Sequence, residues 1–368
     1  MKARSGIVLV GVAVVVSIGA AAPIVNVRAA SGCSVTRLDA IAFPDAGYGV
    51  SVGVDSCNAG VVLTTSNGGA SWFRQAIPAG IGDLQAVSSP DRCHVWAIGW
   101  SSVVGGPIIV RTSDCGVTWT TQLVPYADFL DSISFVDPWH GWIGGGYYGA
   151  GNSVIYQTSD GGNTWTNETG AGASTATRGV FGIKFATTLQ GWAVAADESG
   201  PLAAVIATVD GGLTWTRQAI SPFQQYGRAV YARPDALHAW VVGYGGNSIN
   251  GQLGEGIWRT VSGGNPWIPS PVQSDNSSFS GVSFSDNNNG WVVGGTWPSG
   301  YTGPYYAVIL RSVDGGANWV RQAAPTGLSG LSGVAAVSSS RGCASGGTGT
   351  QGVVVCTSDG GATWSRTF

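Results

Sequence analysis

The sequence has few charged residues and few of the residues that usually cover helix surfaces. Charged side chains make up 10% of the 368 residues, lysine occurs only at Lys2 and Lys184, and methionine occurs once. Helix surfaces are rich in Ala, Glu, Lys and Arg, so this composition argues against a helical protein. Glycine, with 59 residues, and tryptophan, with 16, are abundant instead. That balance is typical of short strands joined by tight turns.

The sequence also lacks clusters of the residues that bind metals or nucleic acids. It has no Cys-x-x-Cys motif, and the only histidines, His94, His140 and His238, lie far apart. A zinc site needs clustered ligands, so we expect no metal and no cofactor. The formal charge is −3, and the first 30 residues hold three basic residues and no acidic one, so the remainder is more acidic still. A nucleic-acid partner, which needs clustered basic charge, is therefore not expected.

The N-terminal residues have the pattern of an export signal. A positive stretch, residues 1–4, precedes an uncharged apolar stretch, residues 6–25, and Val27-Arg28-Ala29 offers small residues for cleavage. This pattern predicts a signal peptide over residues 1–29, one domain over residues 30–368, and a secreted or extracytoplasmic protein of the cell envelope. The apolar stretch is also long enough to span a bilayer, so an uncleaved anchor is the alternative and would be the only membrane contact. Lipidation of Cys33 is a further alternative, against which Arg28 argues because it interrupts the lipobox pattern.

An eight-residue string recurs seven times along the rest of the chain. The copies occupy residues 65–72, 112–119, 158–165, 208–215, 260–267, 312–319 and 357–364, and TSDGGNTW at 158–165 is a representative one. A landmark that reads Gly-Trp in three blades, as in Gly191-Trp192, and that we call the Gly-Trp landmark throughout, precedes every copy. An alternating run such as residues 279–284 precedes the landmark. A period near 50 residues built of short strands is typical of a propeller. The sequence therefore predicts an all-β, seven-bladed β-propeller with four antiparallel strands per blade. The repeated string forms the turn between the third and fourth strands, and blade seven packs on blade one without strand exchange.

The repeated string has a structural explanation. An aspartate at its third position can bond nearby backbone amides, and the glycines that follow allow positive φ. A catalytic residue would not be needed at the same place in every blade, so we interpret these aspartates as structural. They are Asp114, Asp160, Asp210, Asp314 and Asp359. Two copies depart from the pattern, with Asn67 and Ser262 in place of the aspartate.

These strings resemble the Asp-box, also called the bacterial neuraminidase repeat. Together with the Gly-Trp landmark upstream of the turns, they make the chain similar to the propellers of the photosystem II stability and assembly factor type. The resemblance implies a seven-bladed, exported, non-enzymatic assembly factor. That family uses an arginine-rich surface for partner binding, and the matching positions before the repeated string hold Arg111, Arg259 and Arg311. The other four blades lack the arginine, so solvated strand-end arginines are the alternative interpretation.

Three functional classes follow from the sequence. The first is a binding or assembly scaffold outside the cytoplasm, and the second is a lectin-like propeller that binds carbohydrate or peptide. The third is a sialidase-type glycoside hydrolase, which needs two converging carboxylates. A Phe-Arg-Ile-Pro motif is absent, and the only glutamates are Glu168, Glu198 and Glu255, so Glu198 with Asp197 and Glu255 are the best candidates. We therefore predict a protein that is not an enzyme. Its partner would be an envelope or extracellular protein, or a glycan.

The loops between the second and third strands of each blade, called B–C loops, carry many aromatic residues. Aromatic side chains on loops rich in Gly, Ser and Asn give flat contact area at low entropy cost. These loops are expected to lie on one face of the propeller and are predicted to bind the partner, unless the rings only pack their own loops. The residues are Trp100, Tyr147, Tyr148, Tyr244, Trp297, Tyr301, Tyr305 and Tyr306.

The chain has six cysteines, an even number that favours disulfides in an exported protein. Cys93 with Cys115 and Cys343 with Cys356 flank the same hairpins, in register with the strands around them, and Cys33 and Cys57 belong to the same blade. Disulfide geometry requires facing positions at short range. We therefore predict the pairs 33–57, 93–115 and 343–356, all within blades.

Overall fold

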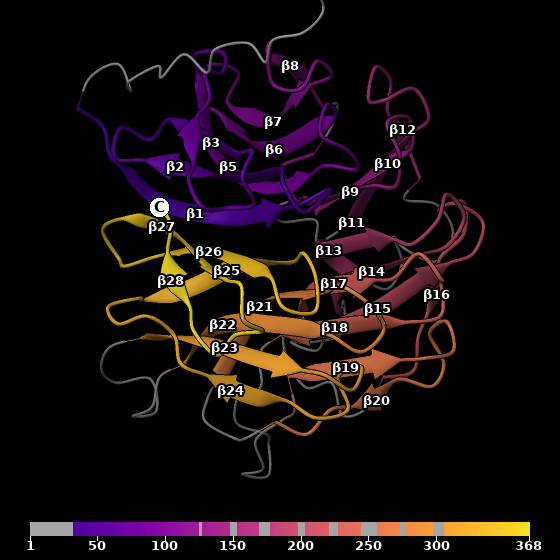
Figure 1. Cartoon of the computed structure of the whole chain (residues 1–368). Coiled ribbons are helices and arrows are strands. Elements are labelled where there is room, and N and C mark those ends of the chain that lie inside the picture. The colour runs from indigo at the N-terminus through magenta and orange to yellow at the C-terminus, as the bar shows by residue number, and fades with distance from the viewer. Residues whose placement is uncertain are drawn as a thin grey trace, which may run out of the picture.

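The computed structural model describes residues 32–124, 127–147, 153–168, 177–197, 203–220, 227–243, 256–272, 277–296 and 305–368. Within these residues the chain forms 28 strands in seven four-stranded antiparallel sheets, each built from consecutive strands (Figure 1). The prediction of an all-β, seven-bladed propeller is confirmed. The predicted signal segment, residues 1–29, lies outside the described residues. No helix in the described part of the chain is long and apolar enough to cross a membrane.

Each blade runs from an inner strand A to an outer strand D. The inner strands are β1 (Val35–Ala42), β5 (Ile81–Ser88), β9 (Phe129–Phe135), β13 (Thr177–Phe185), β17 (Gly227–Ala232), β21 (Ser277–Phe284) and β25 (Gly330–Ala336). The B strands are β2 (Gly49–Asp55), β6 (Val95–Ser101), β10 (Gly141–Gly146), β14 (Gly191–Asp197), β18 (Ala239–Gly243), β22 (Gly290–Thr296) and β26 (Gly342–Gly347). The C strands are β3 (Gly60–Thr65), β7 (Gly106–Thr112), β11 (Ser153–Thr158), β15 (Ala203–Thr208), β19 (Ile257–Thr260), β23 (Tyr306–Ser312) and β27 (Gly352–Thr357). The short D strands are β4 (Phe73–Arg74), β8 (Thr120–Leu123), β12 (Thr166–Asn167), β16 (Thr216–Arg217), β20 (Ile268–Pro269), β24 (Val320–Gln322) and β28 (Ser365–Arg366).

The Gly-Trp landmark is explained by packing between blades. Trp142 at the start of β10 stacks on Phe185 of the next blade, with ring centroids 3.6 Å apart. Trp142 also donates its Nε1–H to the carbonyl of Gly211 in that blade's repeated turn, at 2.8 Å. Phe185 in turn covers Gly191, where a Cβ atom would lie 2.6 Å from the ring. The tryptophan therefore joins two blades, and the glycine makes room for the phenylalanine that the tryptophan needs. The same stacking joins Trp96 to Phe135 and Trp240 to Phe284.

The repeated turn is held by its threonine and aspartate. Asp210 accepts hydrogen bonds from the Thr208 hydroxyl at 2.7 Å and from the Thr214 amide at 2.9 Å. The Thr208 hydroxyl accepts one from the Gly212 amide at 2.9 Å, and Gly211 and Gly212 have φ of 80° and 105°. Only glycine adopts such angles without strain. The hydroxyl and amide of Thr214 lower the Asp210 pKa to about 2. Asp114, Asp160, Asp314 and Asp359 make equivalent bonds.

A second turn, which the sequence analysis missed, lies in the A–B loops. Asp137 accepts hydrogen bonds from the amides of Trp139 and His140, at 2.7 and 2.8 Å, and faces the His140 ring nitrogen at 2.9 Å. Asp91 with His94 and Asp235 with His238 repeat this arrangement. Each aspartate thus caps a turn, and the histidine ring is held beside it.

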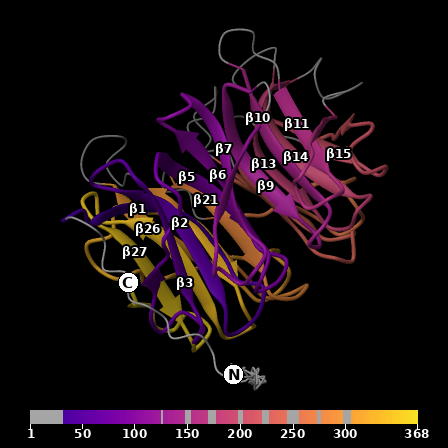
Figure 2. The same ribbon diagram turned by 90° about the horizontal axis from the view of Figure 1, so that it is seen from above.

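The ring closes between blades seven and one. Strand β1 contacts β25, β26 and β27, and Figure 2 shows β1 and β2 beside β26 and β27. Trp72 donates its Nε1–H to the Thr367 hydroxyl at 3.2 Å, and Arg341 donates to the Gly68 carbonyl at 3.0 Å. Each of the two sheets contains four consecutive strands. Closure therefore occurs by packing without strand exchange, as predicted.

The structure contains three disulfides, each within a single blade. They join Cys33 to Cys57, Cys93 to Cys115 and Cys343 to Cys356, the pairs that the sequence analysis predicts. Cys343 and Cys356 are direct partners in the register of β26 and β27. Three disulfides are characteristic of an oxidising, extracytoplasmic environment. The bond at Cys33 occupies the sulfur that lipidation would need.

Candidate binding surfaces

The two ends of the propeller carry different loops. The A–B loops and the repeated turns share one end, which we call the turn face. There the Gly161 amide donates to the Trp139 carbonyl at 2.9 Å, and the Gly211 amide donates to the Leu189 carbonyl at 2.8 Å. The B–C loops and the D–A connections share the other end, where the Asp128 amide bonds the Gly146 carbonyl at 3.0 Å. The two faces can therefore be compared as binding surfaces.

Part of the predicted aromatic site lies on described residues of the B–C loop face. Trp100 is 39% exposed and lies in the same loop region as the exposed Val103 and Val104. Tyr306 is 49% exposed at the start of β23. These residues give blades two and six apolar surface on this face. The predicted residues Tyr148, Tyr244, Trp297 and Tyr301 lie outside the described residues.

Two other aromatic candidates on this face pack against neighbouring residues of the propeller. Tyr147 is partly buried against the core cluster between blades two and three. Tyr305 covers Gly295 and Gly330, and a Cβ atom at either glycine would collide with its ring. For these two residues the structure agrees with the alternative that the rings pack their own surroundings.

The arginines implied by the family resemblance do not form an exposed patch. Arg311 is 7% exposed and lies over the Trp291 ring, 4.0 Å from its centroid. It donates hydrogen bonds to the carbonyls of Gly290 at 3.1 Å, Ser312 at 2.6 Å and Ser339 at 2.6 Å. The Arg311 guanidinium thus fastens blade six to blade seven. This corrects its place among the binding candidates, because the side chain is enclosed by the blades it joins.

Arg111 and Arg259 also lie close to neighbouring structure. Arg111 donates to the Gly161 carbonyl and to the Asn163 side chain of the next blade, each at 2.6 Å. Arg259 is partly buried, and its Nε–H has no partner among the described atoms. Arg111 therefore links two blades in the same way as Arg311. Arg259 alone keeps a donor that nothing in the described part of the chain satisfies.

The carboxylates proposed for a glycosidase are not assembled within the described residues. Glu198 and Glu255 lie outside them, and the side chain of Asp197 is not described. Glu168 is partly exposed in the segment that follows β12.

The turn face carries a run of exposed apolar side chains across blades three to six. Trp139 at the tip of an A–B loop is 60% exposed, and Val209 in a repeated turn is 73% exposed. We call this set the apolar arc, and its members are Trp139, Leu189, Val209, Leu213, Leu237, Val261 and Val313. Neighbouring blades are linked beside two of its members: Gln190, next to Leu189, donates to the Ala236 carbonyl, next to Leu237, at 2.8 Å. Monomeric proteins rarely expose contiguous apolar surface without a binding role.

The arc comes from loop positions at which the blades carry different residues. One such position is the last but one residue of the A–B loop, which holds Trp139, Leu189 and Leu237 in blades three, four and five. Blades one, six and seven have Gly47, Asn288 and Ser340 there, and the carbonyls of these residues accept the same turn hydrogen bond. Val209, Val261 and Val313 hold the second position of the repeated turn, which is serine in the other four blades. The turns share a backbone, but their outward side chains differ. The turn face is therefore more specific than its repeated motif indicates.

Ionised carboxylates surround the arc. Asp137 and Asp235 lie two residues before Trp139 and Leu237, and Asp210 follows Val209. Partial burial raises the pKa of Asp137 and of Asp235, but hydrogen bonds from backbone amides outweigh it and hold both below their usual range. All three carboxylates are therefore negative at neutral pH. The arc combines apolar contact area with negative charge at its margin.

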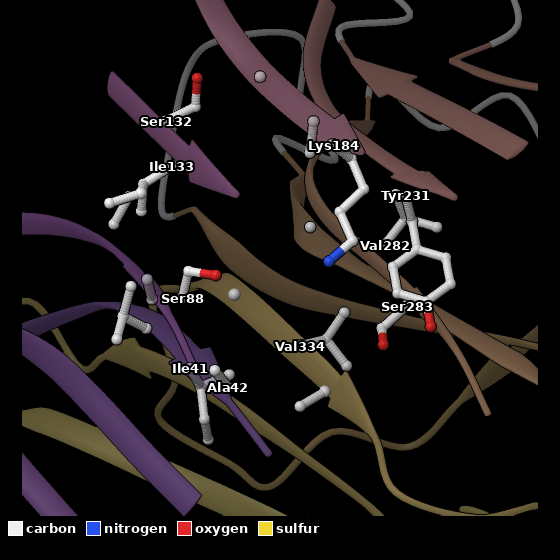
Figure 3. Close-up of a pocket in the computed structure, with 18 of the residues that line it drawn as sticks. Ile41, Ala42, Ser88, Ser132, Ile133, Lys184, Tyr231, Val282, Ser283 and Val334 are labelled. Carbon is white, nitrogen blue, oxygen red and sulfur yellow. The ribbon is translucent and has the colours of Figure 1, made fainter. Parts of the chain in front are cut away.

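A cavity of about 410 Å³ occupies the centre of the ring. All seven inner strands line it, and Figure 3 shows side chains from several of them pointing into it. Its polar side chains include Lys184, Asp131, Ser88 and Ser283. The inner strands therefore line a central channel that carries charged groups.

The fold and these surfaces define a seven-bladed β-propeller with a candidate binding surface on each face and a polar central channel. Among solved structures the chain is similar to "YCF48 bound to D1 peptide", with 17% identity, a TM-score of 0.59, and coverage of 89% of this chain and 94% of that one. It is also similar to YCF48 from Cyanidioschyzon merolae, with 21% identity, a TM-score of 0.58, and coverage of 89% and 96%. A GH74 xyloglucanase from Xanthomonas campestris matches with 15% identity over 89% of this chain and 66% of that one, but its TM-score of 0.36 carries no argument. No protein-family model and no curated protein matches the chain.

The YCF48 structures share the fold with this chain. Their low sequence identity means that they establish the architecture alone, because propellers host many unrelated functions. The function has to be argued from the surfaces of this chain.

Proposed function

We propose that the chain is an exported, non-enzymatic β-propeller that binds a segment of another protein on its turn face. The occupant of the apolar arc is a segment with apolar side chains flanked by Lys or Arg. The observation that carries this proposal is the run of exposed apolar residues over four successive blades. The structure of YCF48 bound to a D1 peptide supports the idea that a propeller of this fold can hold a peptide.

The charge at the margin of the arc selects among possible occupants. A second copy of this chain would bring Asp137, Asp210 and Asp235 against the same carboxylates, and like charges brought together oppose association. A membrane with anionic headgroups meets the same repulsion. A segment that carries apolar and basic side chains satisfies both features of the arc. Basic flanks would also accelerate association at low ionic strength.

The proposal is tested with a peptide array that varies apolar and basic positions independently. Peptides that combine both should bind, and their affinity should fall as salt rises. Leu189→Ser combined with Leu213→Ser should weaken binding by roughly 10-fold or more, since a buried leucine contributes about 1.5–3 kcal/mol. The melting temperature should not change, because both side chains are exposed in the free protein.

The matched control is the B–C loop face, where the sequence analysis places the site. Trp100→Ala and the pair Trp297→Ala with Tyr301→Ala should retain full binding. If these aromatic variants lose binding and the leucine variants keep it, the partner binds on the B–C loop face and the assignment to the turn face is wrong. Equal binding of acidic and basic peptides would refute the choice of occupant.

A further inference from the structure

The central channel contains a lysine that no other group neutralises. Lys184, on inner strand β13, is the only lysine in the described part of the chain, and its ammonium points into the channel (Figure 3). The Lys184 ammonium forms no ion pair and no hydrogen bond with the described residues. It faces the Tyr231 ring, and its Nζ atom lies 6.0 Å from the ring centroid. Burial by the channel wall lowers its pKa. An enclosed ammonium without a partner is unfavourable, so this site suits an anion.

Hydroxyl groups at the level of Lys184 complete a donor set. Ser88 and Ser283 line the same cavity. Ser88, Ser283 and Lys184 each pair with the landmark tryptophan of their own blade, which is Trp96, Trp291 and Trp192 respectively. Because these tryptophans hold the same position in each blade, the three residues lie at one level along the channel. The Ser88 oxygen accepts a hydrogen bond from the Phe135 amide at 2.9 Å, and the Ser283 oxygen accepts one from the Ala336 amide at 3.0 Å. The Ser88 hydroxyl keeps a proton to donate, whereas the Ser283 hydroxyl also bonds the Tyr231 side chain, so Lys184 and Ser88 are the donors for a carboxylate and Ser283 flanks them.

The same channel contains a carboxylate, Asp131, whose charged neighbour is Arg228 and which forms no ion pair with it. Asp131, on neighbouring strand β9, lines the cavity and makes no hydrogen bond or ion pair with the described residues. Burial raises its pKa to about 6, against the opposing effect of Arg228, so at neutral pH it is mostly ionised. Asp131 lies three residues before Ser134, whose pairing with Trp142 places it at the level of Lys184. At about 3.3 Å per residue the two levels are roughly 10 Å apart along the channel.

Between the two charged levels the channel wall is mostly apolar, with Ser132 as a polar exception. Ile133, Ile183, Val282 and Val334 line the cavity from four different blades (Figure 3). A ligand that reached both charges would therefore pass these four apolar side chains. A cavity of about 410 Å³ lies at the small end of the range for small-molecule sites. The ligand must be short, with small apolar side chains.

We propose that the central channel binds a short zwitterionic peptide of about three small residues. Its terminal carboxylate lies against Lys184, Ser88 and Ser283, and its terminal ammonium lies against Asp131. An extended tripeptide spans roughly 10 Å, which matches the separation of the two levels. This site uses only inner-strand residues, so it is independent of the protein partner proposed for the turn face.

The experiment is calorimetric titration of the folded protein with three probes: trialanine, N-acetyl-trialanine and trialanine amide. Acetylation removes the ammonium, and amidation removes the carboxylate. Trialanine should bind, and each capped peptide should bind at least about 30-fold more weakly, as for removal of one partner of an enclosed charge pair. Lys184→Met should abolish the difference between trialanine and its amide. Asp131→Asn should abolish the difference between trialanine and its acetylated form.

Two controls keep the result interpretable. Lys184→Met should fold normally, since it replaces an unpaired enclosed charge with an apolar side chain of similar length, and thermal melting checks this. Glu168→Gln removes a carboxylate outside the channel and should leave all three affinities unchanged. Failure of trialanine to bind overturns the proposal. If amidation weakens binding and acetylation does not, the site holds only a carboxylate and the assignment of Asp131 is wrong.

Discussion

Replacing Gly191 with alanine should destabilise the propeller although it adds one methyl group to a β-strand. The new Cβ atom would lie 2.6 Å from the ring of Phe185. That ring cannot move aside, because Trp142 stacks on one side at 3.6 Å and the Trp215 ring meets it edge-on with centroids 5.9 Å apart. Overpacking of this kind costs about 1–3 kcal/mol. The midpoint of guanidinium unfolding, followed by tryptophan fluorescence, should fall accordingly.

Two further variants isolate the cause. Gly106 also begins a strand, but a Cβ atom there would meet nothing within 4 Å. Gly106→Ala should therefore leave the midpoint unchanged or raise it slightly, through the lower entropy of the unfolded chain. Phe185→Leu makes room for the methyl group, so combining it with Gly191→Ala should cost less than the sum of the two single changes. If Gly191→Ala is no more destabilising than Gly106→Ala, the explanation of the Gly-Trp landmark fails.

Four other outcomes are expected. Trp142→Phe removes the hydrogen bond to the Gly211 carbonyl and should lower the free energy of unfolding by about 1–3 kcal/mol beyond the effect of the lost ring area. Trp192→Phe should lower it less, because the Nε1–H of Trp192 has no partner among the described atoms. Urea unfolding of both variants compares them. Thr214 holds the pKa of Asp210 at about 2, below its value in the unfolded chain. The stabilisation from Asp210 is therefore complete above about pH 4 and is lost as the pH falls through about 2. Asp210→Asn should weaken the acid dependence of the melting temperature in that range, and an unchanged profile would contradict the turn geometry. Replacing Cys343 and Cys356 together by alanine should cost about 3 kcal/mol, as expected for a closed loop of 13 residues, and a melting temperature equal to that of the wild type would mean that the bridge does not form. Finally, the protein should not hydrolyse sialosides or β-glucans in a product assay, and turnover would overturn the non-enzymatic assignment.

The architecture could be predicted because its evidence is local. Each blade contains an alternating run, a Gly-Trp landmark and a turn such as residues 208–215 within about 50 residues, and sequence-adjacent strands pair in order. The disulfides could be predicted for the same reason, because Cys343 and Cys356 lie on two strands of one hairpin. What the pattern did not show was the second turn, in which Asp137 caps an A–B loop beside His140. An aspartate three residues before histidine is the signal that could have found it.

The binding surfaces could not be predicted in the same way. Arg311 lies at a strand end, where sequence reasoning places it in solvent. It is enclosed instead, because Trp291 of its own blade and the Ser339 carbonyl of blade seven hold its guanidinium between them. Trp139 and Val209 belong to turns whose repeated form conceals how exposed their side chains are. Exposure depends on which neighbour packs beside a residue, and that neighbour often belongs to the next blade along the chain.

The sequence by itself therefore determined the units of this protein: the strands, their order within a blade, the turns and the disulfides. Hydrogen bonds and side-chain alternation between adjacent segments specify these features, and short-range patterns record them. Only the tertiary structure decided what the seven units build together. Lys184 and Asp131 come from different blades, and neither is unusual within its own repeat. They come to line one channel because ring closure brings the inner strands together, and neither forms an ion pair with another described residue there.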